Sequence, residues 1–426
     1  MLRGLGDLFS PLRQRECLLL FGSQLASGFG DWAGRLALSV VVYQRSDSAL
    51  WAALVTAVSL LPWIGPGQVV ATFADRLGRI AMMVGCDVVR AVLYLVLLIT
   101  MPLPVVLCVA FLAGLLAPPF AAARSAAMVE VVDPQMYGKA LKLWGATHQF
   151  EAIIGFALGG VLVAAAGVNV AIVLNAATFL VSAVLLLPLW KSGASTVHGT
   201  SASGLSGLRS GIRVWRSDPY LRRGLVLFVG IGAFSVLPEA LAVALVAESE
   251  LPDVFVGLLI ATGAAWSLIV VAMLPDLDTD DELLESAGRR TARYGLGAAV
   301  LFAVVGVATG AVSLFGADVS STAVVAVVAL VSYAIAGGLD SIAVPTNQVV
   351  GRRLPAEGRT AAMSVGMGAA YSGQALLIVV VGAAATVMPV AVVLSVSMAC
   401  AAVMSLWLAR AGQTGLGDLG DLQRAR

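Results

Sequence analysis

Charged side chains are scarce in this sequence. Only 12% of its 426 residues are Asp, Glu, Lys or Arg, whereas soluble domains carry about 25%. Hydrophobic residues make up 59% of the chain, so too few polar side chains remain to cover a surface in water. The composition therefore excludes a soluble globular protein and indicates an integral membrane protein.

Cysteine and histidine are also rare. The four cysteines, Cys17, Cys86, Cys108 and Cys400, lie in or beside apolar runs and lack the close pairing of zinc sites and redox pairs. We interpret them as small apolar side chains, and with only two histidines we expect no metal site. The net charge of +1 and the lack of a basic stripe with interleaved aromatics predict no nucleic-acid partner.

Motifs of catalysis and nucleotide binding are missing as well. The sequence contains no G-x-x-x-x-G-K-[ST] loop, so ATP is not expected to drive this chain. It also contains no nucleophile elbow, metal cluster or soluble catalytic domain. We therefore expect neither an enzyme nor a bound cofactor.

Long apolar runs are abundant. A helix needs about 20 mostly apolar residues to cross the hydrocarbon core, and twelve runs qualify. They lie at residues 17–43, 50–74, 80–101, 103–123, 141–166, 169–190, 222–247, 254–274, 293–316, 322–347, 361–385 and 387–410. The first run is too long for the apolar region of a signal peptide, about 7–15 residues, and is interpreted as the first span.

Lys and Arg are distributed unevenly between the two sides of the predicted spans. With the N-terminus inside, nearly all of the 26 Lys and Arg residues fall in the inner connectors or the helix ends beside them. Arg45 is the exception in the outer connectors. Because cytoplasmic loops are enriched in Lys and Arg, we predict a multi-pass protein of the cell inner membrane with both termini in the cytoplasm.

The connector at residues 191–221 divides the chain. It contains SGASTVHGTSASGLSGLRSG, a Ser/Gly-rich composition typical of a flexible linker. The predicted fold is therefore all-α, with one six-helix bundle at 1–190, a second at 222–410 and a cytoplasmic tail at 411–426.

A dense charge cluster separates the second and third apolar runs. Asp75, Arg76, Gly78 and Arg79 stand within ATFADRLGRI. A positive-inside anchor or a simple polar turn would not explain why an Asp precedes the Arg, or why a Gly stands where the chain must reverse.

This loop resembles the signature loop of the major facilitator superfamily, Gly-x-x-x-Asp-Arg-x-Gly-Arg-Lys. The Asp, both Arg and the second Gly match, whereas Ala71 and Ile80 replace the first Gly and the final Lys. The resemblance implies twelve helices in two bundles and a charge-dipole latch built on Asp75, Arg76, Gly78 and Arg79. Asp87 and Arg90 belong either to that latch or to a local i,i+3 ion pair.

The equivalent loop of the second half contains a partly matching copy of this cluster. Glu285, Gly288 and Arg289 align with Asp75, Gly78 and Arg79. Two parallel six-span repeats are the expected architecture of this superfamily, so the resemblance extends the predicted latch to these three residues.

Other segments resemble the drug- and siderophore-exporter branch of the family, the enterobactin-exporter-like proteins. They are PPFAAARSAAMVEVVDP, the fragment GFALGG in the fifth run, NAATFLVSA and, more weakly, PEALA in the seventh run. GFALGG is similar to the end of the antiporter motif Gly-Pro-x-x-Gly-Gly, with Phe156 in place of Pro. The arginine that many antiporters carry within the fourth span is absent; Arg124 stands at its inner end.

Ionisable residues inside the predicted spans need a reason, because each costs about 2.5–3.5 kcal/mol at the bilayer centre. The candidates for proton coupling or substrate binding are Asp31, Arg35, His148, Glu151, Glu239 and Asp340. The family resemblance places all of them on spans that form or flank the central cavity.

Each candidate also has a plain structural interpretation. Asp31 and Arg35 at i,i+4 form either a structural ion pair or a proton site with competing partners. His148 is either a packing residue or a proton relay beside Glu151. Trp32 and Trp144 either stack on a substrate or pack against helices and lipid.

The sequence predicts a secondary transporter in the lipid bilayer whose partners are protons and a small-molecule substrate. The leading hypothesis is a monomeric, proton-driven exporter of small, partly apolar molecules such as a drug, an antibiotic or a siderophore. A proton-coupled importer of a metabolite and a non-transporting membrane protein on the same fold are the alternatives. The sequence does not identify the substrate, the proton stoichiometry or the coupling carboxylate.

Overall fold

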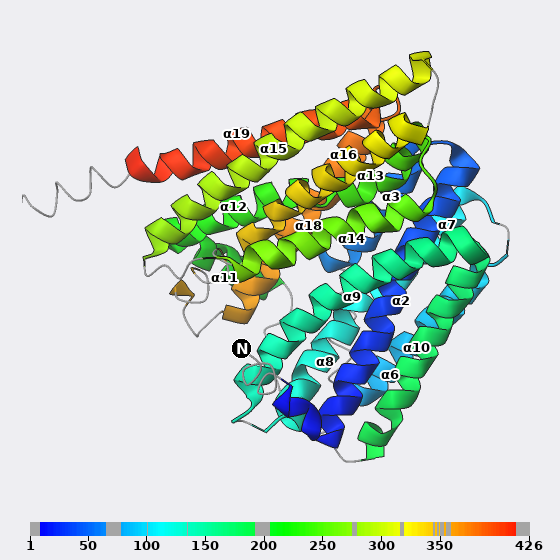
Figure 1. Ribbon diagram of the computed structural model, residues 1–426. Helices are drawn as coiled ribbons and strands as arrows, with labels where there is room; N and C mark the ends of the chain where they lie inside the picture. Colours follow the sequence, from blue (N-terminus) through cyan, green and yellow to red (C-terminus); the bar gives the residue numbers. More distant parts are fainter. Residues whose placement is uncertain are drawn as a thin grey trace, which may run out of the picture. The chain divides into compact units, whose positions relative to one another are not determined.

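The computed structural model is built from helices (Figure 1). It describes residues 9–64, 78–99, 101–133, 135–191, 205–274, 279–315, 319–343, 346, 349, 353–354 and 359–414. Within these residues every regular element is an α-helix or a 3₁₀-helix. The all-α class predicted from the apolar runs is confirmed.

Two compact units make up the chain. The first contains Met1–Asp47, Leu54–Ser201 and Pro252–Ala261, and the second contains Ser48–Ala53, Ala202–Leu251 and Thr262–Arg426. Each unit therefore contains a short segment from the other half of the sequence. A domain boundary at the linker alone does not predict these two segments.

The first unit is organised around helix α2. Its elements are η1 (Ser10–Arg13), α2 (Arg15–Ser46), most of α3 (Ala49–Leu60), η2 (Leu61–Ile64), α6 (Arg79–Val96), α7 (Leu103–Leu115), α8 (Ala117–Val131), α9 (Tyr137–Ala166) and α10 (Val168–Lys191). Helix α2 packs against α9 and α10, and α10 also packs against α6. These contacts bring the polar residues of four helices together.

The second unit is organised around long antiparallel neighbours. Its elements are α11 (Leu205–Ser217), α12 (Pro219–Ser235), α13 (Leu237–Glu248), most of α14 (Val254–Ala272), α15 (Asp280–Phe315), α16 (Val319–Gly337), η3 (Gly338–Ile342), α18 (Arg359–Ala384) and α19 (Val390–Thr414). Helix α15 packs along α19 and α16, and α12 packs along α18.

Two of the predicted spans are interrupted by proline. Pro118 and Pro119 stand in the first turn of α8, directly after α7 ends at Leu115. Pro238 stands in the first turn of α13, after α12 ends at Ser235. Proline has no backbone N–H and fits best in the first turn of a helix, where no partner for that N–H is needed. In both spans the prolines begin a new segment, so each span is built from two helical segments.

Nine helical stretches of the described residues are long and apolar enough to cross a membrane. They agree with nine of the twelve predicted spans, and α2, α3 and α6 occupy the positions of the first three. The bundle architecture predicted from the sequence is confirmed.

Helix α10 shows how such a span divides its surface. Its buried face carries Asn175, Phe179 and Ser182. Its exposed apolar residues recur with the helical repeat and are Val170, Val173, Leu174, Leu180, Val181, Val184 and Leu187. An apolar stripe of this extent is typical of contact with lipid.

Two connectors differ from the sequence-based expectation. Residues 205–217 of the Ser/Gly-rich linker form helix α11, because the Trp215 indole N–H donates to the Ala362 carbonyl at 2.6 Å and its ring is buried. The predicted loop around Glu285 is instead the first part of α15, where an ion pair to Arg289 at 2.6 Å joins successive turns.

Candidate functional site

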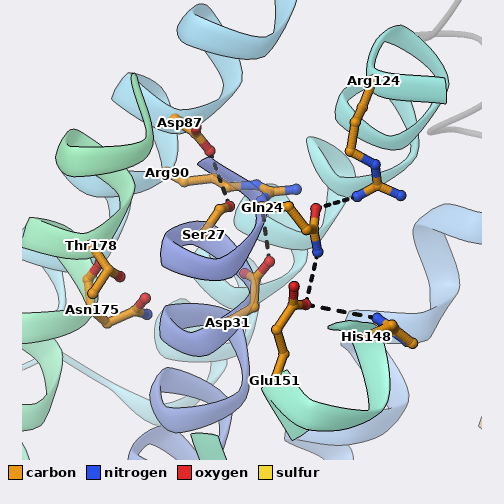
Figure 2. A network of polar contacts seen from close by, with 10 residues as sticks. All are labelled: Gln24, Ser27, Asp31, Asp87, Arg90, Arg124, His148, Glu151, Asn175 and Thr178. Carbon is orange, nitrogen blue, oxygen red and sulfur yellow. Dashed lines mark hydrogen bonds and ion pairs between the residues drawn. The ribbon is translucent and has the colours of Figure 1, made fainter. Parts of the chain in front are cut away.

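A network of polar side chains fills the inside of the first unit (Figure 2). Helix α2 presents Gln24, Ser27 and Asp31 along one face, since their spacing of three and four residues follows the helical repeat. Their partners come from α6, α8 and α9. Four separate helices thus contribute to one polar cluster.

Glycines on α2 make room for the side chains that reach it. A Cβ at Gly28 would overlap the carboxylate of Glu151, and a Cβ at Gly34 would overlap the side-chain amide of Asn175. A Cβ at Gly30 would overlap both Asn175 and Thr178. The Gly-rich stretch of the first span is therefore the surface on which buried polar groups of α9 and α10 rest.

This packing gives a prediction about stability. Gly28→Ala is expected to destabilise the protein by about 1–3 kcal/mol, because Glu151 must leave its position. Gly85→Ala on α6 is the matched control, since nothing lies within 4 Å of its added Cβ; Ala should be neutral or slightly stabilising there. Thermal unfolding of the purified protein in detergent measures both. Equal melting temperatures for the two variants would contradict the packing described.

The first part of the network is a donor chain ending at Glu151. Arg124 Nη1 donates to Gln24 Oε1 at 2.5 Å, and Gln24 Nε2 donates to Glu151 Oε2 at 2.8 Å. Because arginine has no acceptor, Gln24 must turn its oxygen to Arg124 and its NH₂ to Glu151. Glu151 Oε1 is buried and has no hydrogen-bond partner among the described residues.

His148 lies at the edge of this chain. Its Nδ1 is 3.9 Å from Glu151 Oε2, and its side chain is 58% exposed whereas that of Glu151 is 1% exposed. The predicted common face of the two residues is therefore present. A protonated His148 would place a cation beside the Glu151 carboxylate, which also accepts a hydrogen bond from the Gln24 amide.

The second part of the network joins α2 to α6. Arg90 Nη1 lies 3.3 Å from Asp31 Oδ2, and the Ser27 hydroxyl donates to Asp87 Oδ1 at 3.2 Å. Arg90 also lies over the rings of Phe120 and Phe179, with its Cζ 5.4 and 5.5 Å from their centroids. Its guanidinium is thus held among two aromatic rings and a carboxylate.

Asp31 has an ion-pair partner on another helix. Asp31 is paired with Arg90 of α6, whereas Arg35 lies over the Trp32 ring at 4.4 Å from the ring centroid. Spacing along one helix identifies only neighbours on that helix, so the tertiary partner was missed.

Both candidate stacking residues are engaged within the protein. Trp32 packs against Phe156, His148 and Arg35. Trp144 lies beneath Arg124, 3.8 Å from ring centroid to Cζ, and meets the edge of Phe21. A role in substrate stacking remains a prediction for both tryptophans.

The predicted latch residues are only partly described. Asp75 and Arg76 lie outside the described residues. Gly78 has φ +82°, a left-handed conformation that favours glycine, and Arg79 forms an ion pair with Glu130 and donates to the Ala126 carbonyl. The end of the signature loop therefore contacts α8 through an ion pair and a hydrogen bond of Arg79.

The corresponding residues of the second half lie in a helix. Glu285 and Arg289 form an ion pair within α15, and Gly288 lies between them. Their predicted role as the second half of a latch remains a prediction.

Two candidate carboxylates lie in the second unit, next to helix breaks. Glu239 stands in the first turn of α13, directly after Pro238, whose carbonyl accepts a hydrogen bond from the Tyr333 hydroxyl at 2.8 Å. Asp340 stands in η3 and interacts with Ser235 and with Glu239. The two carboxylates are therefore neighbours, although they belong to different predicted spans.

Several members of the network were not predicted. Gln24 and Ser27 carry no charge and lie in a Gly-rich stretch that was interpreted as packing. A usable signal was their position one and two turns before Asp31 on the same helical face. Arg124 was placed at the end of its span, but α8 continues to Val131, so Arg124 belongs to the span. No cluster of metal-ligating side chains occurs among the described residues.

Comparison with known proteins identifies the family. The family model of the Major Facilitator Superfamily matches residues 20–378. Because the match covers most of the chain, the chain belongs to this superfamily, and it is a multi-pass membrane protein. The predicted superfamily is confirmed.

Two relatives from Bacillus subtilis (strain 168) resemble parts of the chain. The uncharacterized MFS-type transporter YkuC is 27% identical over 184 residues, which cover 42% of this chain and 42% of that protein. The uncharacterized MFS-type transporter YfiS is 25% identical over 266 residues, which cover 61% of this chain and 64% of that protein. The chain spans less than two thirds of the length of both relatives.

The fold is shared with solved structures. A crystal structure of the peptide transporter POT in complex with sulfate superimposes with a TM-score of 0.71 at 12% identity, covering 96% of both chains. At this identity the likeness establishes the common fold.

Proposed function

We propose that the chain is a proton-driven exporter of small, partly apolar molecules, such as a drug, an antibiotic or a siderophore, that works by alternating access. The observation that carries this proposal is the polar network of the first unit. It contains the carboxylates of Asp31 on α2, the predicted first span, and of Glu151 on α9, a candidate span. Ionisable residues are rare in such spans and typically functional.

Proton coupling follows from the unequal surroundings of these two carboxylates. Asp31 is 39% exposed and faces the cation Arg90, so a proton and a cationic group compete for it. Glu151 is buried and receives only one short hydrogen bond among the described residues, so it can hold a proton on its second oxygen. Loading and release of protons at these sites would drive the transport cycle.

Other predicted residues take supporting roles in this proposal. Arg35 and His148 adjust the charge around Asp31 and Glu151, while Trp32 and Trp144 present partly exposed rings to a substrate. Glu239 and Asp340 form a second acidic site. The latch of Asp75, Arg76, Gly78 and Arg79 with Glu285, Gly288 and Arg289 would stabilise one state of the cycle.

The export direction is supported by the resemblance of the fourth to sixth spans to exporters. We place the transporter in the cell inner membrane as a monomer with both termini in the cytoplasm. Cells expressing the chain should accumulate less of a substrate, taken from a panel of dyes, antibiotics and siderophores, than cells expressing Asp31→Asn. Higher accumulation would favour import by proton symport, and no difference for any compound would favour a non-transporting protein.

A further inference from the structure

Arg90 is a buried cation with two acidic neighbours. Its side chain is 2% exposed, and a buried charge is stable only when an opposite charge and hydrogen bonds compensate for its lost hydration. Asp31 supplies one partner from α2 at 3.3 Å. Asp87 stands three residues earlier on α6 and is completely buried. Asp31 is therefore paired with the guanidinium, whereas Asp87 influences it electrostatically and accepts a hydrogen bond from the Ser27 hydroxyl.

Complementary hydrogen-bonding groups remain unused within this trio. Arg90 Nε and Asp87 Oδ2 are both buried, and neither has a hydrogen-bond partner among the described residues. One is a donor and the other an acceptor, and their residues are spaced i,i+3 on the same helix, where side chains meet. The Arg90 guanidinium lies near the rings of Phe120 and Phe179, which do not hold it by a hydrogen bond from Nε.

The two carboxylates differ in access to water. Asp31 is 39% exposed whereas Asp87 is not exposed. Figure 2 shows Arg90 between them, with the Ser27 hydroxyl directed at Asp87. A proton arriving from solvent therefore reaches Asp31 first, while Asp87 is available only to the groups already packed around it.

We propose that Asp31, Arg90 and Asp87 form one proton-binding site, in which protonation of Asp31 transfers the Arg90 guanidinium to Asp87. One proton from water binds a carboxylate oxygen of Asp31, and the Asp31–Arg90 ion pair is exchanged for an Arg90–Asp87 ion pair. No covalent bond changes, and the net charge of the trio rises from −1 to 0. Deprotonation of Asp31 reverses the exchange.

Other charged and titratable groups surround the site. Arg35 of α2 and Tyr94 of α6 interact electrostatically with the site, as does Arg124 of α8. Arg124 is engaged by Gln24 and influenced by Glu151 of α9. Helix α10 contributes the neutral groups Asn175 and Ser182, and Cys86 of α6 lies near Arg90 and Asp87.

This inference deepens the proposed proton coupling and rests on it, but its test does not require a substrate. Infrared difference spectroscopy of the purified full-length protein, recorded as the pH is lowered, detects the C=O stretch of each newly protonated carboxylic acid. We expect a band that is absent from Asp31→Asn. The pH at which this band reaches half its full intensity, the midpoint, depends on how strongly Asp31 and Asp87 each attract Arg90.

Two variants should move this midpoint in opposite directions. Asp87→Asn leaves Arg90 to Asp31 alone, so the midpoint should fall by about one pH unit, as expected for a strengthened ion pair. Ser27→Ala removes a donor from Asp87, which then draws Arg90 more strongly, so the midpoint should rise. Ser27→Ala removes only one hydroxyl, so its midpoint can still be measured if Asp87→Asn fails to fold. Glu250→Gln, at an exposed turn, is the matched control with no expected shift.

Each outcome of this titration is informative. Opposite shifts in folded Asp87→Asn and Ser27→Ala protein support the shared site, whether or not any transport is detected. An unchanged midpoint in both variants, with folding intact, would overturn it and leave Asp87 as a structural partner of Ser27. If the two variants shift the midpoint as expected but no compound is transported, the result counts against the proposed function and not against the proton site.

Discussion

Asp31→Asn is expected to reduce substrate-dependent proton movement by at least about tenfold, a difference of about 1.4 kcal/mol in an equilibrium. The reason is that Asn preserves the size of the side chain but cannot bind and release a proton. It also removes the counter-charge of Arg90, which lies 3.3 Å away and is buried. The exposed carboxylate of the network would thus be lost both as a proton acceptor and as an ion-pair partner.

Asp47→Asn is the matched control for this variant. Asp47 ends the same helix at φ +47°, a left-handed conformation that Asn tolerates well. The Asp47→Asn protein should release protons like the wild type, as recorded with a pH-sensitive dye in membrane vesicles. Equal proton release by Asp31→Asn and the wild type would move coupling away from Asp31 and make its pair with Arg90 structural.

Glu151→Gln should be the second variant with a large effect. Gln retains an oxygen that accepts from Gln24 Nε2, so the donor chain from Arg124 can persist. What is lost is the negative charge near Arg124 and His148, together with the unpartnered oxygen Oε1. We expect correct folding but at least a tenfold loss of coupled transport, about 1.4 kcal/mol.

The control for this variant is Glu282→Gln, which makes the same chemical change at an exposed position of α15. Melting temperature and transport are measured on the same preparations, so that lost activity is separated from lost folding. A fully active Glu151→Gln protein would show that Glu151 only organises Gln24 and Arg124.

The sequence predicted most of the fold because long apolar runs carry a strong signal. The runs at 141–166 and 169–190 correspond closely to α9 (Tyr137–Ala166) and α10 (Val168–Lys191). Connectors were harder to predict, because their structure depends on tertiary contacts. Helix α11 forms in a Ser/Gly-rich segment whose Trp215 is buried against α18, and no local pattern reveals that partner.

The sequence predicted the charged residues of the candidate site but not the partners with which they interact. Asp31, His148 and Glu151 were recognised because charge within an apolar run is costly. Their tertiary partners came from other helices: Arg90 pairs with Asp31, and Gln24 with Glu151. A single sequence gives helical spacing but not the rotation of one helix against another, so cross-helix partners were not accessible to it.

The central claim is that the chain couples proton flow to export. Inverted membrane vesicles with an acidic interior, supplied with a panel of dyes, antibiotics and siderophores, test it most directly when proton efflux and substrate uptake are recorded together. Our account predicts substrate-dependent proton efflux that matches substrate uptake in the wild type and is lost in Asp31→Asn. Substrate movement that is indifferent to the pH gradient, or no coupled movement with any compound, would contradict it.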